Sequence, residues 1–308
     1  MKKKLIVILG PTASGKSELA IKLAKKFNGE IISADSRQVY RGMNIGTGKI
    51  TKKEMSGIPH YLINIVYPNE KFNVAIYKKL AIKAIKDIQS QGKLPFLVGG
   101  TGLYIQAVVD NIEFPKVPPQ KRLREKLEKK SVRELFEIYK KIDEEGAKYI
   151  EKENKRRLIR AIEVCTITGK SFWQQRKKGA KLLFDVLEIG MKLPKRELKK
   201  RIKKRVEKMF KMGLEKEAKY LVEEYGHIPS LQTIGYQEWQ DFFEGKIGKE
   251  KVKELIILHT IQFAKRQMTW FKKGKRIHWL KNYKQAEKLA KEFLPSSRNL
   301  TKVFFRKP

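Results

Sequence analysis

The sequence predicts an α/β protein, a parallel sheet with flanking helices into which a helical domain is inserted. Over the first 113 residues, short apolar runs alternate with segments of helical periodicity. The first run, residues 5–9, ends in a glycine-rich loop, as a buried strand should. Residues 114–182 then hold no convincing strand before an apolar run returns. Such an alternation of strands and helices is typical of a doubly wound parallel sheet.

The first part of the chain supplies four expected strands. After residues 5–9, Leu19, Leu23 and Phe27 recur at helical spacing and predict a helix behind the glycine loop. The further elements expected here are strands at 30–35, 60–66 and 94–98 and a helix over 73–91.

The second part begins with a break in this pattern. Three prolines within 114–119 end the alternation, and short charged helices are expected up to residue 182. We therefore expect the first part of the core at 1–113, the insertion at 114–182, and the second part of the core with C-terminal helices at 183–308. The elements expected after the insertion are strands at 184–191 and 276–280, helices at 195–212, 214–225, 236–244 and 249–272, and a loosely held tail at 296–308.

The composition is that of a very basic globular protein. The 308 residues are 41% hydrophobic and carry a formal net charge of +37, which attracts polyanions, although a general lysine bias would have the same effect. No apolar run is long enough to cross a membrane, so no membrane association is expected. A single cysteine, Cys165, permits no internal disulfide and fits the cytoplasm. The four histidines lack the spacing of metal ligands.

The glycine loop fits the phosphate-binding pattern G-x-x-x-x-G-K-[ST]. Its residues are Gly10, Pro11, Thr12, Ala13, Ser14, Gly15, Lys16 and Ser17. The glycines let backbone N–H groups turn toward phosphate oxygens, and the helix that follows adds partial positive charge. Lys16 is expected to pair with the terminal phosphate and Ser17 to bind Mg²⁺. The core is therefore predicted to be a P-loop NTPase-like sheet.

The carboxylates decide whether this loop holds a nucleotide. Nucleotide-hydrolysing enzymes usually place an acidic residue near Mg²⁺ at the end of a buried strand, whereas the run at 94–98 ends in Gly99-Gly100-Thr101. This weakens an ATPase interpretation and leaves open a diphosphate that departs from another substrate. Asp35 ends the run at 30–35, where open sheets bind ligands, and is a candidate general base. The alternative is that Asp35 only caps the next turn.

Six motifs follow the phosphate loop in order. They are DSRQVYRGMNIGT (35–47), GIPHYL (57–62), LVGGTGLY (97–104), KRRLIRAIEV (155–164), QTIGYQE (232–238) and KRQMTWF (265–271). Together they resemble the tRNA dimethylallyltransferase, or tRNA isopentenyltransferase, family over about residues 5–280. Gly48 and Ile50 stand where that family often has Ala and Pro, and we expect both positions to be peripheral.

The resemblance implies transfer of the dimethylallyl group from dimethylallyl diphosphate to N6 of adenosine 37 in the anticodon loop of tRNA. The phosphate loop would then hold the diphosphate of the prenyl donor, with Mg²⁺ as cofactor. Asp35 would accept the N6 proton, and Thr101 would contact the reacting end of the diphosphate. Arg201 and Arg205 resemble family arginines near the diphosphate, with a solvated basic helix as the alternative.

A second surface is expected to bind the tRNA anticodon stem-loop. RNA recognition favours unstacked bases held on aromatic or arginine planes, and a base that reacts must leave its stack. Without the resemblance, such clusters are more often solvated helix faces with core aromatics. The residues expected there are Asp35, Ser36, Arg37, Gln38, Arg156, Arg157, Leu158, Ile159, Arg160, Gln232, Thr233, Ile234, Gly235, Tyr236, Gln237, Lys265, Arg266, Gln267 and Trp270.

Three other functions are open at this point. A P-loop small-molecule kinase would consume ATP with an alcohol acceptor. An enzyme that prenylates free adenine nucleotides would have little use for the basic insertion. An RNA-binding NTPase-like module would bind RNA regardless of Asp35. We expect a cytoplasmic monomer that acts on tRNA.

Overall fold

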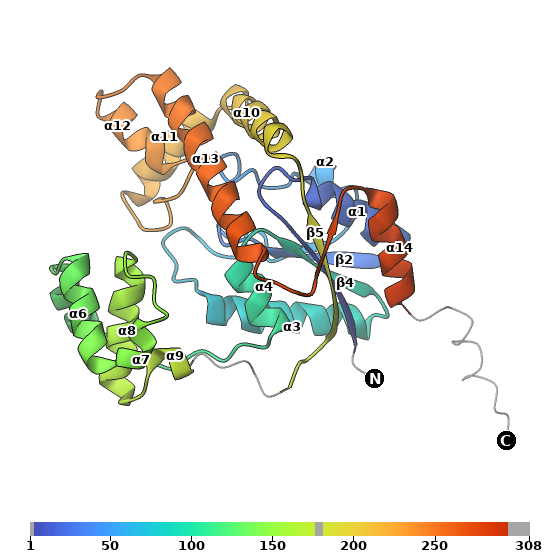
Figure 1. Cartoon of the computed structure of the whole chain (residues 1–308). Helices are drawn as coiled ribbons and strands as arrows, with labels where there is room; N and C mark the ends of the chain where they lie inside the picture. The colour runs from blue at the N-terminus through green and yellow to red at the C-terminus, as the bar shows by residue number, and fades with distance from the viewer. Residues whose placement is uncertain (1–2, 176–180, 295–308) are drawn as a thin grey trace. The chain divides into compact units, whose positions relative to one another are not determined.

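The computed structural model describes residues 3–175 and 181–294 (Figure 1). The chain divides into two compact units, residues 1–108 with 183–308, called the core below, and residues 109–182, called the insertion. The tail expected at 296–308 lies outside the described residues.

A six-stranded parallel sheet forms the centre of the core, in the order β3-β2-β4-β1-β5-β6. The predicted α/β fold is thereby confirmed. Parallel strands bring their carboxyl ends, and the loops that follow them, to one edge of the sheet. The strands are β1 (Lys4–Leu9), β2 (Gly29–Ala34), β3 (His60–Tyr61), β4 (Leu94–Gly99), β5 (Asp185–Met191) and β6 (Ile277–Leu280).

The strand expected at 60–66 is wrong beyond its first two residues. Leu62 and Asn64 have positive φ angles of 62° and 55°, which interrupt an extended strand. The amide of Asn64 donates instead to the carbonyl oxygen of Gln38. The apolar residues of this run therefore support the loop that follows β2.

Helices cover both faces of the sheet (Figure 1). On one face, α1 (Lys16–Lys26) and α14 (Tyr283–Phe293) share a hydrophobic cluster with β1, β4 and β5. On the other, α3 (Val74–Ser90) packs on β2 and β4, and α4 (Gly102–Val109) follows β4 directly. The short α2 (Lys52–Met55) lies in the loop region after β2. No helix of the described chain is long and apolar enough to cross a membrane.

The helices after β5 form a second hydrophobic cluster around the fully buried Trp239. The helix expected at 236–244 is divided into a single 3₁₀ turn and the short α12. In α10, Ile202, Val206 and Met209 are buried and recur at helical spacing, so they form the buried face of this helix. The elements are α10 (Lys195–Lys211), α11 (Leu214–Tyr225), η1 (Gln237–Trp239), α12 (Gln240–Phe243) and α13 (Lys249–Phe271).

The secondary structure of the insertion, among its described residues, consists of helices joined by loops. Leu135, Tyr139 and Leu158 are fully buried in its own hydrophobic cluster. The carboxylate of Asp143 accepts hydrogen bonds from the Tyr139 and Ser171 hydroxyls and so ties two of its segments together. Its helices are α5 (Lys121–Glu128), α6 (Val132–Ile142), α7 (Glu144–Ala147), α8 (Lys155–Thr168) and α9 (Phe172–Gln175).

Candidate active site

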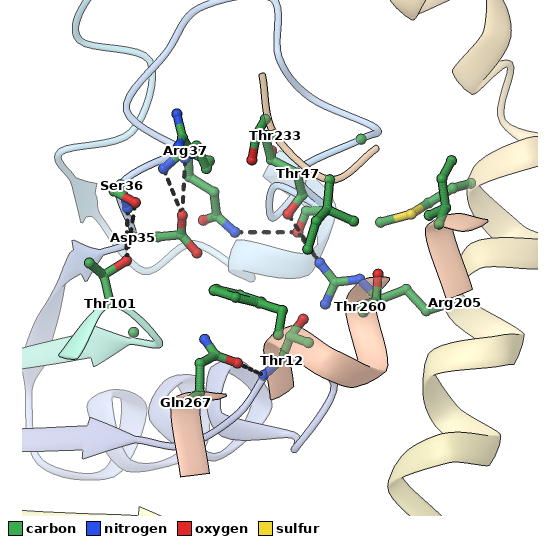
Figure 2. Close-up of a pocket in the computed structure, with 18 of the residues that line it drawn as sticks. Thr12, Asp35, Ser36, Arg37, Thr47, Thr101, Arg205, Thr233, Thr260 and Gln267 are labelled. Atoms are coloured by element: carbon green, nitrogen blue, oxygen red, sulfur yellow. Dashed lines mark hydrogen bonds between the residues drawn. The ribbon is translucent and has the colours of Figure 1, made fainter. Parts of the chain in front are cut away.

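A pocket of about 380 Å³ lies at the carboxyl ends of β2 and β4, beside the phosphate loop that follows β1 (Figure 2). Helices α10 and α13 contribute side chains to its wall, as do the loops at 46–48 and 232–237. The predicted site residues that line it are Thr12, Lys16, Ser17, Asp35, Ser36, Arg37, Gln38, Thr101, Arg205, Gln232, Thr233, Ile234, Gln237, Arg266 and Gln267.

The phosphate loop runs from the end of β1 into α1, which is the structural context that its pattern requires. Gly15, which precedes α1, has a φ of 89°, in the left-handed region that glycine adopts without steric penalty. The Nζ atom of Lys16 donates to the Pro11 carbonyl oxygen at 3.2 Å and so lies over the loop. Burial and the nearby Arg205 lower the pKa of Lys16 to about 8, against the opposing effect of Asp35. A cation and a helix N-terminus thus converge where a phosphate group would bind.

Asp35 lies opposite this loop and both caps a turn and faces the pocket. Its Oδ1 accepts from the backbone amides of Arg37 at 2.8 Å and Gln38 at 3.3 Å, so the capping alternative is correct for one oxygen. Oδ2 takes no part in these two bonds. The hydroxyl of Thr101 accepts from the amide of Ser36 at 3.0 Å, which joins the ends of β2 and β4 (Figure 2). The site therefore holds a carboxylate oxygen after β2 and a hydroxyl after β4, and a hydrogen bond joins the two segments.

The loop at 44–48 forms the wall next to Arg205. Nη2 of Arg205 donates to the carbonyl oxygens of Thr47 at 3.1 Å and Gly48 at 3.3 Å. Gly48 has a φ of 56°, and a Cβ built on it would lie 1.7 Å from this nitrogen. The expectation that position 48 is peripheral is therefore wrong, because only a residue without a side chain leaves room for the guanidinium as it lies here.

A carboxylate from α11 holds the same loop through its backbone amides. Glu217 accepts from the amides of Asn44, Ile45 and Gly46 and from the Tyr236 hydroxyl at 2.7 Å. Tyr236 is 3% exposed, so the structure makes it a support of the pocket wall and contradicts its predicted contact with RNA.

Arg201 does not line the pocket but lies near the phosphate loop. A Cβ built on Gly15 would be 3.5 Å from its Nη1. Its Nε donates to Glu197 on the exposed side of α10. Arg205 thus faces the pocket directly, whereas Arg201 lies at its edge.

The predicted RNA contacts on α13 have different environments. Lys265 and Arg266 are exposed, and Arg266 reaches the pocket. Trp270 packs against Gly102, because a Cβ there would lie 2.3 Å from its Cδ1. Gln267 is buried, and its side-chain amide forms hydrogen bonds through both its oxygen and its nitrogen.

The predicted contacts in the insertion are corrected in part. Leu158 and Ile159 are 0% and 3% exposed within its hydrophobic cluster, so their predicted contact with RNA is wrong. Arg157 pairs with Glu151, while Arg156 is exposed on α8.

Across the whole site, the predicted residues outside the pocket lining are Gly10, Pro11, Ala13, Ser14, Gly15, Arg156, Arg157, Leu158, Ile159, Arg160, Arg201, Gly235, Tyr236, Lys265 and Trp270.

Arg160 is held by a buried carboxylate of its own helix. It pairs with Glu163, which is fully buried and also binds Arg124. Although burial opposes it, hydrogen bonds from Arg124, the Gln120 amide and Arg160 hold the pKa of Glu163 at about 2. Arg160 is therefore part of the internal support of the insertion.

Sequence reasoning missed several residues of the pocket. Thr260 and Phe263 precede Gln267 by seven and four residues on α13 and so share its helix face. Extending that face backward would have found both. The apolar members of the lining are Val98, Val206, Met209, Ile234, Ile256 and Phe263.

The oxygen atoms of the pocket suit Mg²⁺ bound together with a diphosphate. Ser17 supplies a hydroxyl next to Lys16, and Asp35 supplies a carboxylate in the same pocket. Mg²⁺ in phosphate sites usually takes only one or two protein oxygens and fills its other positions with water and phosphate. Among the described residues, no group of three or more His, Cys, Asp or Glu could hold a metal. The residues present therefore fit a metal that the substrate largely ligates.

Known proteins similar to this chain share one family. The sequence model of the IPP transferase family matches residues 38–274. A tRNA dimethylallyltransferase of Pelotomaculum thermopropionicum is 42% identical over 94% of this chain and 95% of that protein. One of Staphylococcus epidermidis is 46% identical over 90% of this chain and 86% of that protein.

Solved structures agree with this result. A tRNA delta(2)-isopentenylpyrophosphate transferase from Staphylococcus epidermidis has a TM-score of 0.69 at 42% identity, over 94% of this chain and 98% of that one. A eukaryotic dimethylallyltransferase acting on tRNA has a TM-score of 0.78 at 31% identity, over 97% of this chain and 77% of that one. By its sequence along most of its length and by its fold, this chain belongs to the IPP transferase family.

Proposed function

We propose that this protein transfers the dimethylallyl group of dimethylallyl diphosphate to N6 of adenosine 37 of tRNA, giving N6-dimethylallyladenosine and diphosphate. The observation that carries the proposal is a single pocket with the phosphate loop on one side and Asp35 with Thr101 on the other. Family membership supports the reaction type, since the curated relatives are named tRNA dimethylallyltransferases.

The prenyl donor occupies the side of the pocket formed by the phosphate loop and α10. Backbone amides of the loop, Lys16 and Arg205 bind the diphosphate and stabilise the charge that grows on it as the C–O bond breaks. Ser17 would hold Mg²⁺, which would supply further positive charge to the diphosphate. The apolar residues of the lining, among them Met209 and Phe263, suit the dimethylallyl group.

The acceptor adenine enters from the side of Asp35. Its N6 amino group is a poor nucleophile, because the lone pair is delocalised into the ring. N6 bonds to the carbon of the dimethylallyl group that carries the diphosphate oxygen, and diphosphate leaves with the electron pair of the broken C–O bond. Oδ2 of Asp35 accepts the proton that N6 loses. Thr101 places its hydroxyl beside the reacting end of the diphosphate.

The tRNA is held by basic side chains around this pocket and by the insertion. Lys265 and Arg266 project from α13, and Arg156 is exposed on α8 of the insertion. The formal charge of +37 raises the association rate with RNA in general. Adenosine 37 leaves the anticodon stack to reach Asp35. We place this reaction in the cytoplasm and expect a monomer to carry it out.

The test is mass analysis of nucleosides from unmodified tRNA incubated with the protein, Mg²⁺ and dimethylallyl diphosphate. We expect N6-dimethylallyladenosine with the parent and a large loss with Asp35→Asn. In parallel, thermal unfolding is measured with dimethylallyl diphosphate or with ATP. Protection by ATP alone, together with unmodified tRNA, would show that the loop serves a nucleotide and that the proposal is wrong.

A further inference from the structure

The side chain of Gln267 connects the phosphate loop to the end of β4. Gln267 lies on α13 and is only 7% exposed. Its Oε1 accepts from the Thr12 amide at 2.8 Å (Figure 2). Its Nε2 donates to the Gly100 carbonyl oxygen at 2.9 Å. One amide group thus satisfies backbone groups of two loops that are far apart in the sequence.

The backbone opposite Gln267 has no room for a side chain. A Cβ at Gly100 would lie 2.3 Å from Nε2 of Gln267, and one at Gly102 would lie 2.3 Å from Cδ1 of Trp270. Gln267 and Trp270 are one helical turn apart, so α13 contacts the segment after β4 at two successive points. The glycines of this segment allow that approach.

Two hydrogen bonds and short backbone segments connect Gln267 to the neighbour of the proposed base. Thr101 follows Gly100 directly and accepts from the amide of Ser36, the neighbour of Asp35. At the other end, the Thr12 amide belongs to the phosphate loop and already donates to Gln267. Gln267 therefore adds a side-chain link between the phosphate loop and the segment that contacts the neighbour of Asp35, beyond the pairing of β1 with β4 and of β4 with β2.

We propose that Gln267 is a positioning residue, which sets the separation between the diphosphate and the acceptor nitrogen rather than binding RNA. This inference rests on the proposed function. Shifts of about 1 Å between reacting groups are enough to lower rates roughly a hundredfold. The amide is suited to the task because it accepts from an N–H and donates to a C=O at the same time.

The experiment compares Gln267→Met and Gln267→Glu with the parent. Methionine has a similar length and makes neither bond, while an ionised glutamate accepts from Thr12 but cannot donate to Gly100. A protonated glutamic acid can do both. Gln262→Met is the control, since Gln262 is exposed on the same helix.

Single-turnover transfer at saturating donor and tRNA should fall about ten- to a hundredfold in Gln267→Met, with unchanged tRNA affinity and salt dependence. The activity of Gln267→Glu relative to the parent should recover as pH falls toward 5, because protonation restores the donor. A purely structural role would not produce this recovery.

Two results would overturn the inference. One is weaker tRNA binding with an altered salt dependence but normal transfer per bound complex. The other is normal transfer per folded molecule together with a lower melting temperature only. The proposed function fails separately, if the parent protein itself makes no dimethylallyladenosine. In that case, thermal protection of the parent and the variants by pyrophosphate still shows whether Gln267 affects ligand binding by the phosphate loop.

Discussion

Replacing Gly48 with alanine should displace Arg205, and the size of the effect follows from the geometry. The new Cβ would lie 1.7 Å from Nη2, so the guanidinium must leave the carbonyl oxygens of Thr47 and Gly48. The φ of 56° adds strain of about 1–2 kcal/mol for an L-residue. Losing the contacts of a charged donor adds about 1–2 kcal/mol, since the partly buried Arg205 regains some hydration.

Gly92→Ala separates these two contributions. Gly92 has a similar φ of 70°, but nothing lies within 4 Å of its added Cβ, so this variant has the strain alone. We expect urea unfolding to show that Gly48→Ala lowers the free energy of unfolding by about 1–2 kcal/mol more than Gly92→Ala.

A double-mutant cycle with Arg205→Ala completes the test. Without the guanidinium, Gly48→Ala should lower stability no more than Gly92→Ala does. Equal losses for Gly48→Ala and Gly92→Ala in the parent background, or the same loss for Gly48→Ala with and without Arg205, would refute the reasoning.

Three further predictions address catalysis, pH and RNA binding. Asp35→Asn should keep tRNA affinity and reduce single-turnover transfer about 10²–10⁴-fold, and near-normal transfer would exclude a general base at this position. Burial lowers the pKa of Lys49 from 10.5 to about 8. Between pH 8 and 10.5 the unfolded chain therefore binds a proton at Lys49 that the folded chain has lost. The free energy of unfolding of the parent, measured by urea titration relative to Lys49→Met, should rise over this pH range. A difference that does not change with pH would contradict the lowered pKa. Lys265→Ala should reduce the slope of log tRNA affinity against log salt by somewhat under one unit, whereas Arg205→Ala should leave that slope unchanged. The control is Lys129→Ala, at an exposed residue of the insertion, which should also leave it unchanged. Equal slopes in all three variants would contradict the distinction between charges that face RNA and charges that face diphosphate.

The centre of the sheet and the phosphate loop were predictable because their signals are local. Residues 5–9 are an uninterrupted apolar run, and the loop pattern follows it at once. The run at 60–66 looks equally apolar, but tertiary contacts of Asn64 with the loop after β2 override its strand propensity. The residues around 60–66 alone do not show that Asn64 will bond to Gln38.

The roles of the site residues were less predictable where they depend on distant contacts. Gln267 was expected to touch RNA because its motif is basic and aromatic, yet its partners lie at Thr12 and Gly100. Leu158 and Ile159 failed for another reason, since two apolar residues in an amphipathic helix belong to its buried face. Their apolar side chains indicated burial, but they were assigned to RNA contact because they lie between the arginines of the motif.

The place of β5 in the sheet has a consequence for synthesis of the chain on the ribosome. β1 pairs with β4 on one side and with β5 on the other, and β5 begins only after the insertion. At translation speeds of about 5–20 residues per second, the segment at 109–182 takes roughly 4–15 s to emerge. Throughout that interval the apolar edge of β1 is complete but unpaired, and such an edge is a template for pairing with another nascent chain. Rapid folding of the insertion does not shorten this exposure, because only the arrival of residues 185–191 closes the edge.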